Sequence, residues 1–224
     1  MTRQNTKLID LLIEKIKDQK TEELISFITQ NPGVLNEKDR NNSSGFLLIA
    51  YSNISSVFKK AIALKQTFNF QEAILSGKID IVKSFVEKDK NKVHEYSSDG
   101  FTPIALASFF DQTAIAEYLL EQGANPGLAA KNPSKVNALH AAVAKENITL
   151  CRLFIENRID VNSTQIQNVT PLHSAVHRGN LPLVKLLIAN GADITLKMDN
   201  GDDALTIAKR DKHNEILNFL IEKN

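Results

Sequence analysis

Four short segments of this chain resemble one another and recur at a nearly constant spacing. They are Thr102–Ala107, Asn137–Ala142, Thr170–Ala175 and Asp203–Ala208, and their final alanines follow one another after 35, 33 and 33 residues. A period of about 20 to 50 residues is typical of repeat proteins, in which each unit packs only on its neighbours. The spacing therefore predicts one continuous stack of units rather than a globular domain around a single central core.

The segment that begins at Thr170 shows why one unit should fold as two short helices. Thr170 can cap a helix that starts at Pro171, and Gly179 can end that helix because glycine readily adopts a positive φ. Asn180 can cap a second helix, which Gly191 ends. We expect the following side chains to face the neighbouring units: Leu172, Ala175 and Val176 in the first helix, and Leu183, Leu186 and Leu187 in the second.

Two further features bear on this alignment. A large apolar residue lies eight positions after the final alanine of each of the four segments. The same offset after Ala73 identifies a further unit. Asp111, Glu146 and Lys212 occupy the position of Gly179, so three first helices end without glycine and are expected to be weaker there. The apolar residues at the offset of eight are Ile81, Ile115, Leu150, Leu183 and Ile216.

The pattern becomes irregular toward the N-terminus. Ala50 lies only 23 residues before Ala73, which leaves no room for a complete turn between two units. An earlier helix pair is expected between residues 8 and 28, with Leu8, Leu12 and Ile16 on one inward face. We interpret the region up to about residue 66 as degenerate repeats that cap the stack, since a terminal unit needs a polar outer face.

The segment Thr-Pro-Leu-His-Ser-Ala at 170–175 and the Gly-Ala pairs at 123–124 and 191–192 resemble the ankyrin repeat. The resemblance covers most of the chain and implies an all-α fold, an ankyrin-repeat solenoid of stacked helix-turn-helix units joined by hairpin-like turns. It also implies a single domain over residues 1–224, which we divide as follows: degenerate N-terminal capping repeats at 1–66, repeats at 67–98, 99–131, 132–166 and 167–199, and a C-terminal capping repeat at 200–224.

The overall composition argues against several classes of partner and compartment. A formal net charge of +1 over 224 residues gives no electrostatic case for nucleic acid or an anionic membrane. A single cysteine, Cys151, allows no internal disulfide, which fits a reducing compartment. Asp10 and Glu14 interrupt the N-terminal apolar residues, so no secretory signal is indicated, and no apolar stretch reaches the roughly 18 residues of a membrane span. We expect a monomeric cytoplasmic protein.

The residues that could carry chemistry are better explained by structural roles. The resemblance places His140 and His173 where the ankyrin repeat has a histidine that ties a turn to its neighbours by hydrogen bonds. His173 and His177 have a spacing that can bind zinc, but a closed site needs two further ligands. Cys151 is expected to fill the core and Asp203 to cap a helix. We therefore predict no catalytic residues, no metal and no cofactor in a chain that is not an enzyme.

The positions that the repeat leaves free should form a continuous concave surface of turn tips and first-helix ends. Ankyrin proteins are similar to one another in using this surface to recognise other proteins. Turn positions such as Phe101 and Ile166 are apolar, and exposed apolar surface marks interaction sites. The residues predicted to bind a partner are Asp99, Phe101, Phe109, Phe110, Val136, Lys145, Ile166, Val169, His177, Arg178, Asp199 and Arg210.

These inferences lead to a non-enzymatic module that binds a still unidentified partner protein through its concave face. The mixed signs of the charges on that face favour a protein with its own charge pattern over a polyanion. Two alternatives stay open at this point: an inhibitor or immunity protein that blocks a cognate toxin or enzyme, and an undetected enzyme or metal protein.

Overall fold

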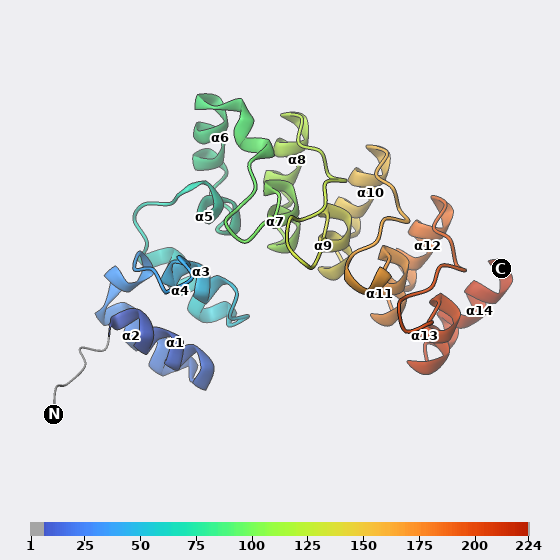
Figure 1. The fold of residues 1–224 in the computed structure, drawn as a ribbon, viewed down its shortest axis with the longest axis horizontal. Helices are drawn as coiled ribbons and strands as arrows, with labels where there is room; N and C mark the ends of the chain where they lie inside the picture. Colours follow the sequence, from blue (N-terminus) through green and yellow to red (C-terminus); the bar gives the residue numbers. More distant parts are fainter. Residues whose placement is uncertain (1–6, 224) are drawn as a thin grey trace. The chain divides into compact units, whose positions relative to one another are not determined.

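Every regular element that the computed structural model describes, across residues 7–223, is a helix (Figure 1). Residues 1–6 and 224, which belong to the predicted end caps, lie outside the described residues. The chain divides into two compact units, Met1–Ser76 and Gly77–Asn224. The all-helical organisation confirms the predicted fold class.

The core of the first unit lies between α1, α2, α3 and α4, where Leu12, Leu24 and Phe46 are completely buried. The prediction that Leu8 faces inward was wrong, because Leu8 is 37% exposed. The helix instead turns Ile9 and Leu12, three positions apart, toward the core. The elements of this unit are α1 (Leu8–Asp18), α2 (Thr21–Gln30), η1 (Pro32–Leu35), α3 (Gly45–Ala50), α4 (Ser55–Leu64) and α5 (Phe70–Leu75).

The end of the first unit confirms that its helices are too closely spaced for a complete turn. Residues 65–69 connect α4 directly to α5. A capping box then starts α5, in which the Asn69 side chain accepts from Glu72 N and the Glu72 carboxylate accepts from Asn69 N. The connection is therefore fixed by side chains rather than by a hairpin-like turn.

The second unit consists of two rows of helices (Figure 1). The first helices of the repeats, α7, α9, α11 and α13, pack side by side in one row, and α6, α8, α10, α12 and α14 form the row of second helices. The elements are α6 (Ile79–Lys88), η2 (Lys90–His94), α7 (Pro103–Phe109), α8 (Thr113–Glu121), α9 (Ala138–Ala144), α10 (Ile148–Glu156), η3 (Ile166–Asn168), α11 (Pro171–His177), α12 (Leu181–Ala189), α13 (Ala204–Arg210) and α14 (Asn214–Lys223).

The core of the second unit follows the repeat pattern. The alanines at 107, 142, 175 and 208 are completely buried, and the apolar residues eight positions later in α8, α10, α12 and α14 are also buried. One expected interface residue, Leu186, is only half-buried. The buried face of α12 instead consists of Leu183, Val184 and Leu187, so Leu186 lies at the edge of that face.

The helix caps predicted at Thr170 and Asp203 are present, and the equivalent residues of two other repeats cap their helices in the same way. The side chains of Thr102, Asn137, Thr170 and Asp203 each accept a hydrogen bond from the backbone N–H three residues later. This satisfies a donor that would otherwise lack a partner in the first turn of the helix. The same cap at the same place in four repeats sets all first helices to start at equivalent positions.

The residues that replace glycine at the ends of first helices adopt the glycine conformation. Asp111, Glu146 and Lys212 have φ values of 57°, 57° and 62°, close to the 71° and 70° of Gly77 and Gly179. The positional equivalence inferred from the repeats is therefore confirmed. Adopting this left-handed conformation costs free energy for a residue with a side chain but not for glycine.

Candidate functional site

The turn tips of the second unit are joined to one another through their backbones. In each case an N–H of one tip donates to a carbonyl oxygen of the preceding tip, which fixes the spacing of the side chains along the row. The bonds run from Lys131 N to Gly100 O (2.8 Å), from Ile166 N to Ser134 O (2.9 Å) and from Asp199 N to Gln167 O (3.0 Å). The predicted binding residues on this row are Asp99, Phe101, Val136, Ile166, Val169 and Asp199.

Apolar side chains occur among the polar residues of these tips. Ile166, in η3, leaves 49% of its surface exposed. Phe101, Val136 and Val169 are half-buried and so keep part of their apolar surface accessible to solvent. The tip row therefore presents apolar surface in three successive repeats.

An aromatic side chain and a lysine from neighbouring repeats meet at the ends of the first helices. Lys145 Nζ, just after α9, lies 5.5 Å from the centroid of the Phe109 ring at the end of α7, within the range of a cation–π interaction. Phe109 is 45% exposed. The half-buried Phe110 ring packs edge-on against it, with the centroids 5.5 Å apart. Of the two phenylalanines, Phe109 is the more accessible.

The predicted basic residues farther along the first helices are paired with carboxylates. Arg178 Nη1 lies 4.0 Å from Glu146 Oε1, and His177 Nδ1 lies 2.7 Å from Asp211 Oδ2. Arg210 also pairs with Asp211, at 2.9 Å between Nε and Oδ1. Hydrogen bonds from Arg210 and His177 lower the pKa of Asp211 to about 2, so this carboxylate stays ionised at neutral pH.

The tips and the exposed ends of α7, α9, α11 and α13 together define what we call the turn-and-first-helix face. In the last repeat its two rows meet, because Arg210 forms an ion pair with Asp202 in the preceding turn. Every predicted binding residue lies on one of these rows and is exposed or half-buried. The face is thus a row of apolar side chains bordered by paired charges.

A family profile described as ankyrin repeats (3 copies) matches residues 5–165 and 139–224, nearly the whole sequence. The chain belongs to the ankyrin-repeat family. It is also similar to the human protein named DNA-binding protein RFXANK, with 32% identity over 69 residues. That match covers 31% of this chain and 26% of the human protein, so the chain spans about a quarter of this relative's length. Ankyrin repeats are protein-interaction modules and are typically not enzymes.

The two histidines expected to tie a turn to its neighbours by hydrogen bonds are buried and make such bonds. His140 Nε2 donates to Ser163 O at 3.1 Å, and His173 Nε2 donates to Leu196 O at 2.9 Å. Burial lowers the pKa of His140 to about 4 and also lowers the pKa of His173. Both rings are therefore neutral at pH 7, and their structural role is confirmed.

The other groups considered for metal binding or reactivity are a metal-ligating cluster and the buried Cys151. Within residues 7–223, no group of three or more His, Cys, Asp or Glu side chains converges in a way that could hold a metal ion. Burial raises the pKa of the Cys151 thiol to about 12, so the thiol is protonated at neutral pH. No helix in the same range is long and apolar enough to cross a bilayer.

Glu146 and Asp111 contribute to the face, but they were absent from the predicted site. Besides its contact with Arg178, Glu146 accepts from Asn180 Nδ2 at 2.7 Å, and Asp111 accepts from Asn147 Nδ2 at 2.6 Å. Each contact joins one ankyrin repeat to the next. The available signal was the acidic residue in place of glycine together with an asparagine one repeat later.

Proposed function

We propose that this ankyrin-repeat chain is a non-enzymatic module that binds a partner protein through the turn-and-first-helix face. One observation carries the proposal: Phe109 and Ile166 are large apolar side chains with 45% and 49% of their surface exposed. The neighbouring repeat contacts the ring of Phe109 through Lys145 and holds the backbone of Ile166 through Ser134 O. Large apolar side chains on a preorganised surface are the usual anchors of protein interfaces.

The charges on the face support a protein partner rather than nucleic acid. Arg178, His177 and Arg210 are each paired with a carboxylate, so they do not form an unbalanced basic surface of the kind that phosphates require. The formal net charge of the chain is only +1. A partner with both apolar and charged side chains complements such a face best.

The proposal is tested by comparing proteins captured by three versions of the chain in its native host. The test variant is Phe109→Ala with Ile166→Asp, and the matched control is Ile221→Asp, which places an acidic residue at a 60% exposed site on α14. Circular dichroism first establishes that both variants are folded. We expect at least one protein to be enriched equally by wild type and control and at least tenfold less by the test variant.

Equal enrichment of every captured protein by a folded Phe109→Ala/Ile166→Asp variant would show that this face does not bind the partner. Purified partner and chain then allow the same comparison by calorimetry. Duplex DNA is then added as a competitor. Displacement of the partner by DNA in a salt-dependent manner would contradict a protein-binding face.

A further inference from the structure

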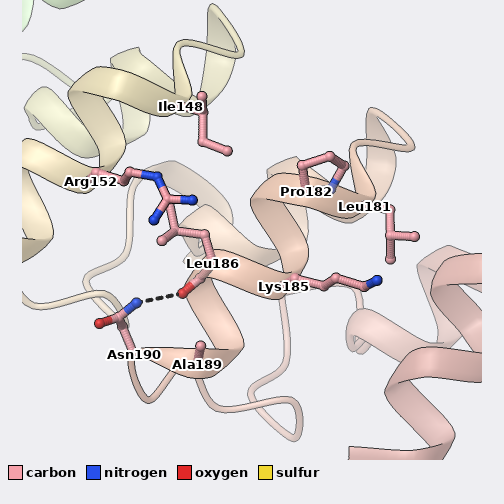
Figure 2. A pocket seen from close by; sticks show the side chains of 8 residues that line it. All are labelled: Ile148, Arg152, Leu181, Pro182, Lys185, Leu186, Ala189 and Asn190. Carbon is pink, nitrogen blue, oxygen red and sulfur yellow. Dashed lines mark hydrogen bonds between the residues drawn. The ribbon is translucent and has the colours of Figure 1, made fainter.

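A second surface feature lies among the second helices, away from the turn tips. A groove of about 500 Å³ runs between α10 and α12 and is open to solvent (Figure 2). Its apolar lining includes Ile148 on α10 and Pro182, Leu186 and Ala189 on α12. The groove therefore exposes apolar surface on a part of the repeat that the proposed function does not use.

Two other steps between second helices are filled by a lysine lying over an aromatic ring. Lys83 of α6 has its Nζ 5.5 Å from the centroid of the Tyr118 ring in α8. Lys185 of α12 has its Nζ 5.6 Å from the centroid of the Phe219 ring in α14. In each pair the lysine is the fifth residue of its helix and the ring is the sixth residue of the next one.

Arg152 and Leu186 occupy these two positions at the step between α10 and α12. Leu186 offers no ring on which a cation could lie, and its side chain is smaller than that of Tyr118 or Phe219. Arg152 extends from α10 into the space beside Leu186 (Figure 2). The position that carries an aromatic ring in those two steps is thus aliphatic at this groove.

The charge of the groove is positive. Arg152 and Lys185 line it, and no carboxylate does. Among residues 7–223 the structure gives Arg152 no ion-pair partner, and α12 contains no acidic residue at all. A ligand that fills the groove therefore gains most if it combines apolar groups with a carboxylate that reaches the guanidinium.

We propose that this groove binds an amphipathic helix of a partner protein that carries an acidic residue beside its apolar stripe. Pro182, Leu186 and Ala189 are spaced i, i+4 and i+7, so the lined stretch is about two helical turns, or roughly 10 Å long. That length and the open side match the apolar stripe of a docked helix. A small molecule would instead need an enclosed pocket that buries most of its surface.

The test uses two variants, one that fills the groove and one that reverses its charge. Leu186→Phe supplies the missing ring and should fill the step in the way that Phe219 fills its own. Arg152→Glu reverses the charge of the groove at an exposed residue. The matched control is Lys83→Glu, the same reversal at the corresponding position of the step already filled by Tyr118.

The probe is a yeast-displayed library of 16-residue helical peptides, sorted on labelled wild-type chain in the presence of excess unlabelled Leu186→Phe chain. We expect enriched peptides to carry apolar residues at i, i+4 and i+7 flanked by Asp or Glu. Their affinity should fall at least tenfold for both groove variants and change less than twofold for Lys83→Glu. Thermal melts establish that the variants are folded.

Several results would overturn this proposal. They are enriched peptides without an excess of acidic residues, equal affinity for wild type and folded Leu186→Phe, or no peptide that depends on the groove. Sedimentation of the chain alone covers one other occupant: self-association that Leu186→Phe abolishes would assign the groove to a second copy of this chain. The readouts do not involve Phe109 or Ile166, so failure of this proposal would not contradict the function proposed for the turn-and-first-helix face.

Discussion

Lys65 Nζ lies 3.3 Å from Glu72 Oε1, and both side chains are almost fully buried, with 2% and 5% of their surface exposed. Ser44 Oγ also donates to Glu72 Oε1, at 3.0 Å, and Lys65 Nζ donates to Asn36 Oδ1. The other oxygen of Glu72 accepts from the backbone N–H of Asn69. This buried polar cluster fixes residues 65–69, the connection that lacks a regular turn.

Removing one charge of this pair should destabilise the first unit strongly. Lys65→Met leaves the Glu72 carboxylate buried without its cation, which costs about 3–5 kcal/mol of unfolding free energy. The double variant Lys65→Met/Glu72→Gln removes both charges and keeps an acceptor for Asn69, so it should recover a large part of the loss. Urea unfolding followed by circular dichroism measures both. A double variant no more stable than Lys65→Met would show that the ion pair is not the cause.

The buried histidines should make stability depend on pH in the acidic range. Unfolded histidine binds a proton near pH 6.5, whereas burial lowers the pKa of folded His140 to about 4. The unfolded chain therefore holds more protons between these values, and stability falls as the pH drops from 6.5 toward 4. His140 alone should account for about 2 kcal/mol between pH 8 and pH 5.

The pH effect is measured by urea unfolding at closely spaced pH values. His140→Gln, which cannot titrate, should be less stable than wild type at pH 8 because it lacks the imidazole that bonds Ser163 O. Its unfolding free energy should nevertheless vary less between pH 6.5 and 4.5 than that of wild type. A slope identical to that of wild type would assign the acid sensitivity to other groups.

Two leucines of the same repeat should respond differently to truncation. Leu172 is 1% exposed, so Leu172→Ala should cost about 2–5 kcal/mol through lost burial and a cavity. Leu186 lines an open groove, and Leu186→Ala should cost about 1 kcal/mol or less. Hydrogen exchange after Leu172→Ala should show the largest loss of protection in α9, α11 and α13, because repeats contact only their neighbours. Uniform loss along the second unit would indicate one cooperative block.

The left-handed helix ends give different predictions for two glycine substitutions. Lys212 is exposed and has φ 62°, so Lys212→Gly should raise the unfolding free energy by about 0.5–1 kcal/mol by relieving backbone strain. Glu146→Gly relieves the same strain but removes the contacts with Arg178 and Asn180, so it should give no net gain. Thermal melts of both variants provide the comparison, and a Lys212→Gly variant that melts below wild type would contradict the strain argument.

The repeat pattern predicted the second unit well because its signals are local. A cap such as Thr170, a small residue such as Ala175 and a helix end such as Gly179 act within a few residues of one another, and their recurrence reports the stack. The first unit was harder to predict, since its short connection depends on Lys65 and Glu72 meeting inside the core.

The amino-acid order was enough to establish the helical repeats, their caps, their buried alanines and the row of residues left on the turn tips, because each of these follows from short-range spacing. Only the folded chain revealed that Arg178 pairs with Glu146 and that Arg152 and Leu186 line the same open groove. Such pairings join residues about one repeat apart, and small differences in side-chain size and direction decide them. Spacing alone carries no information about those differences.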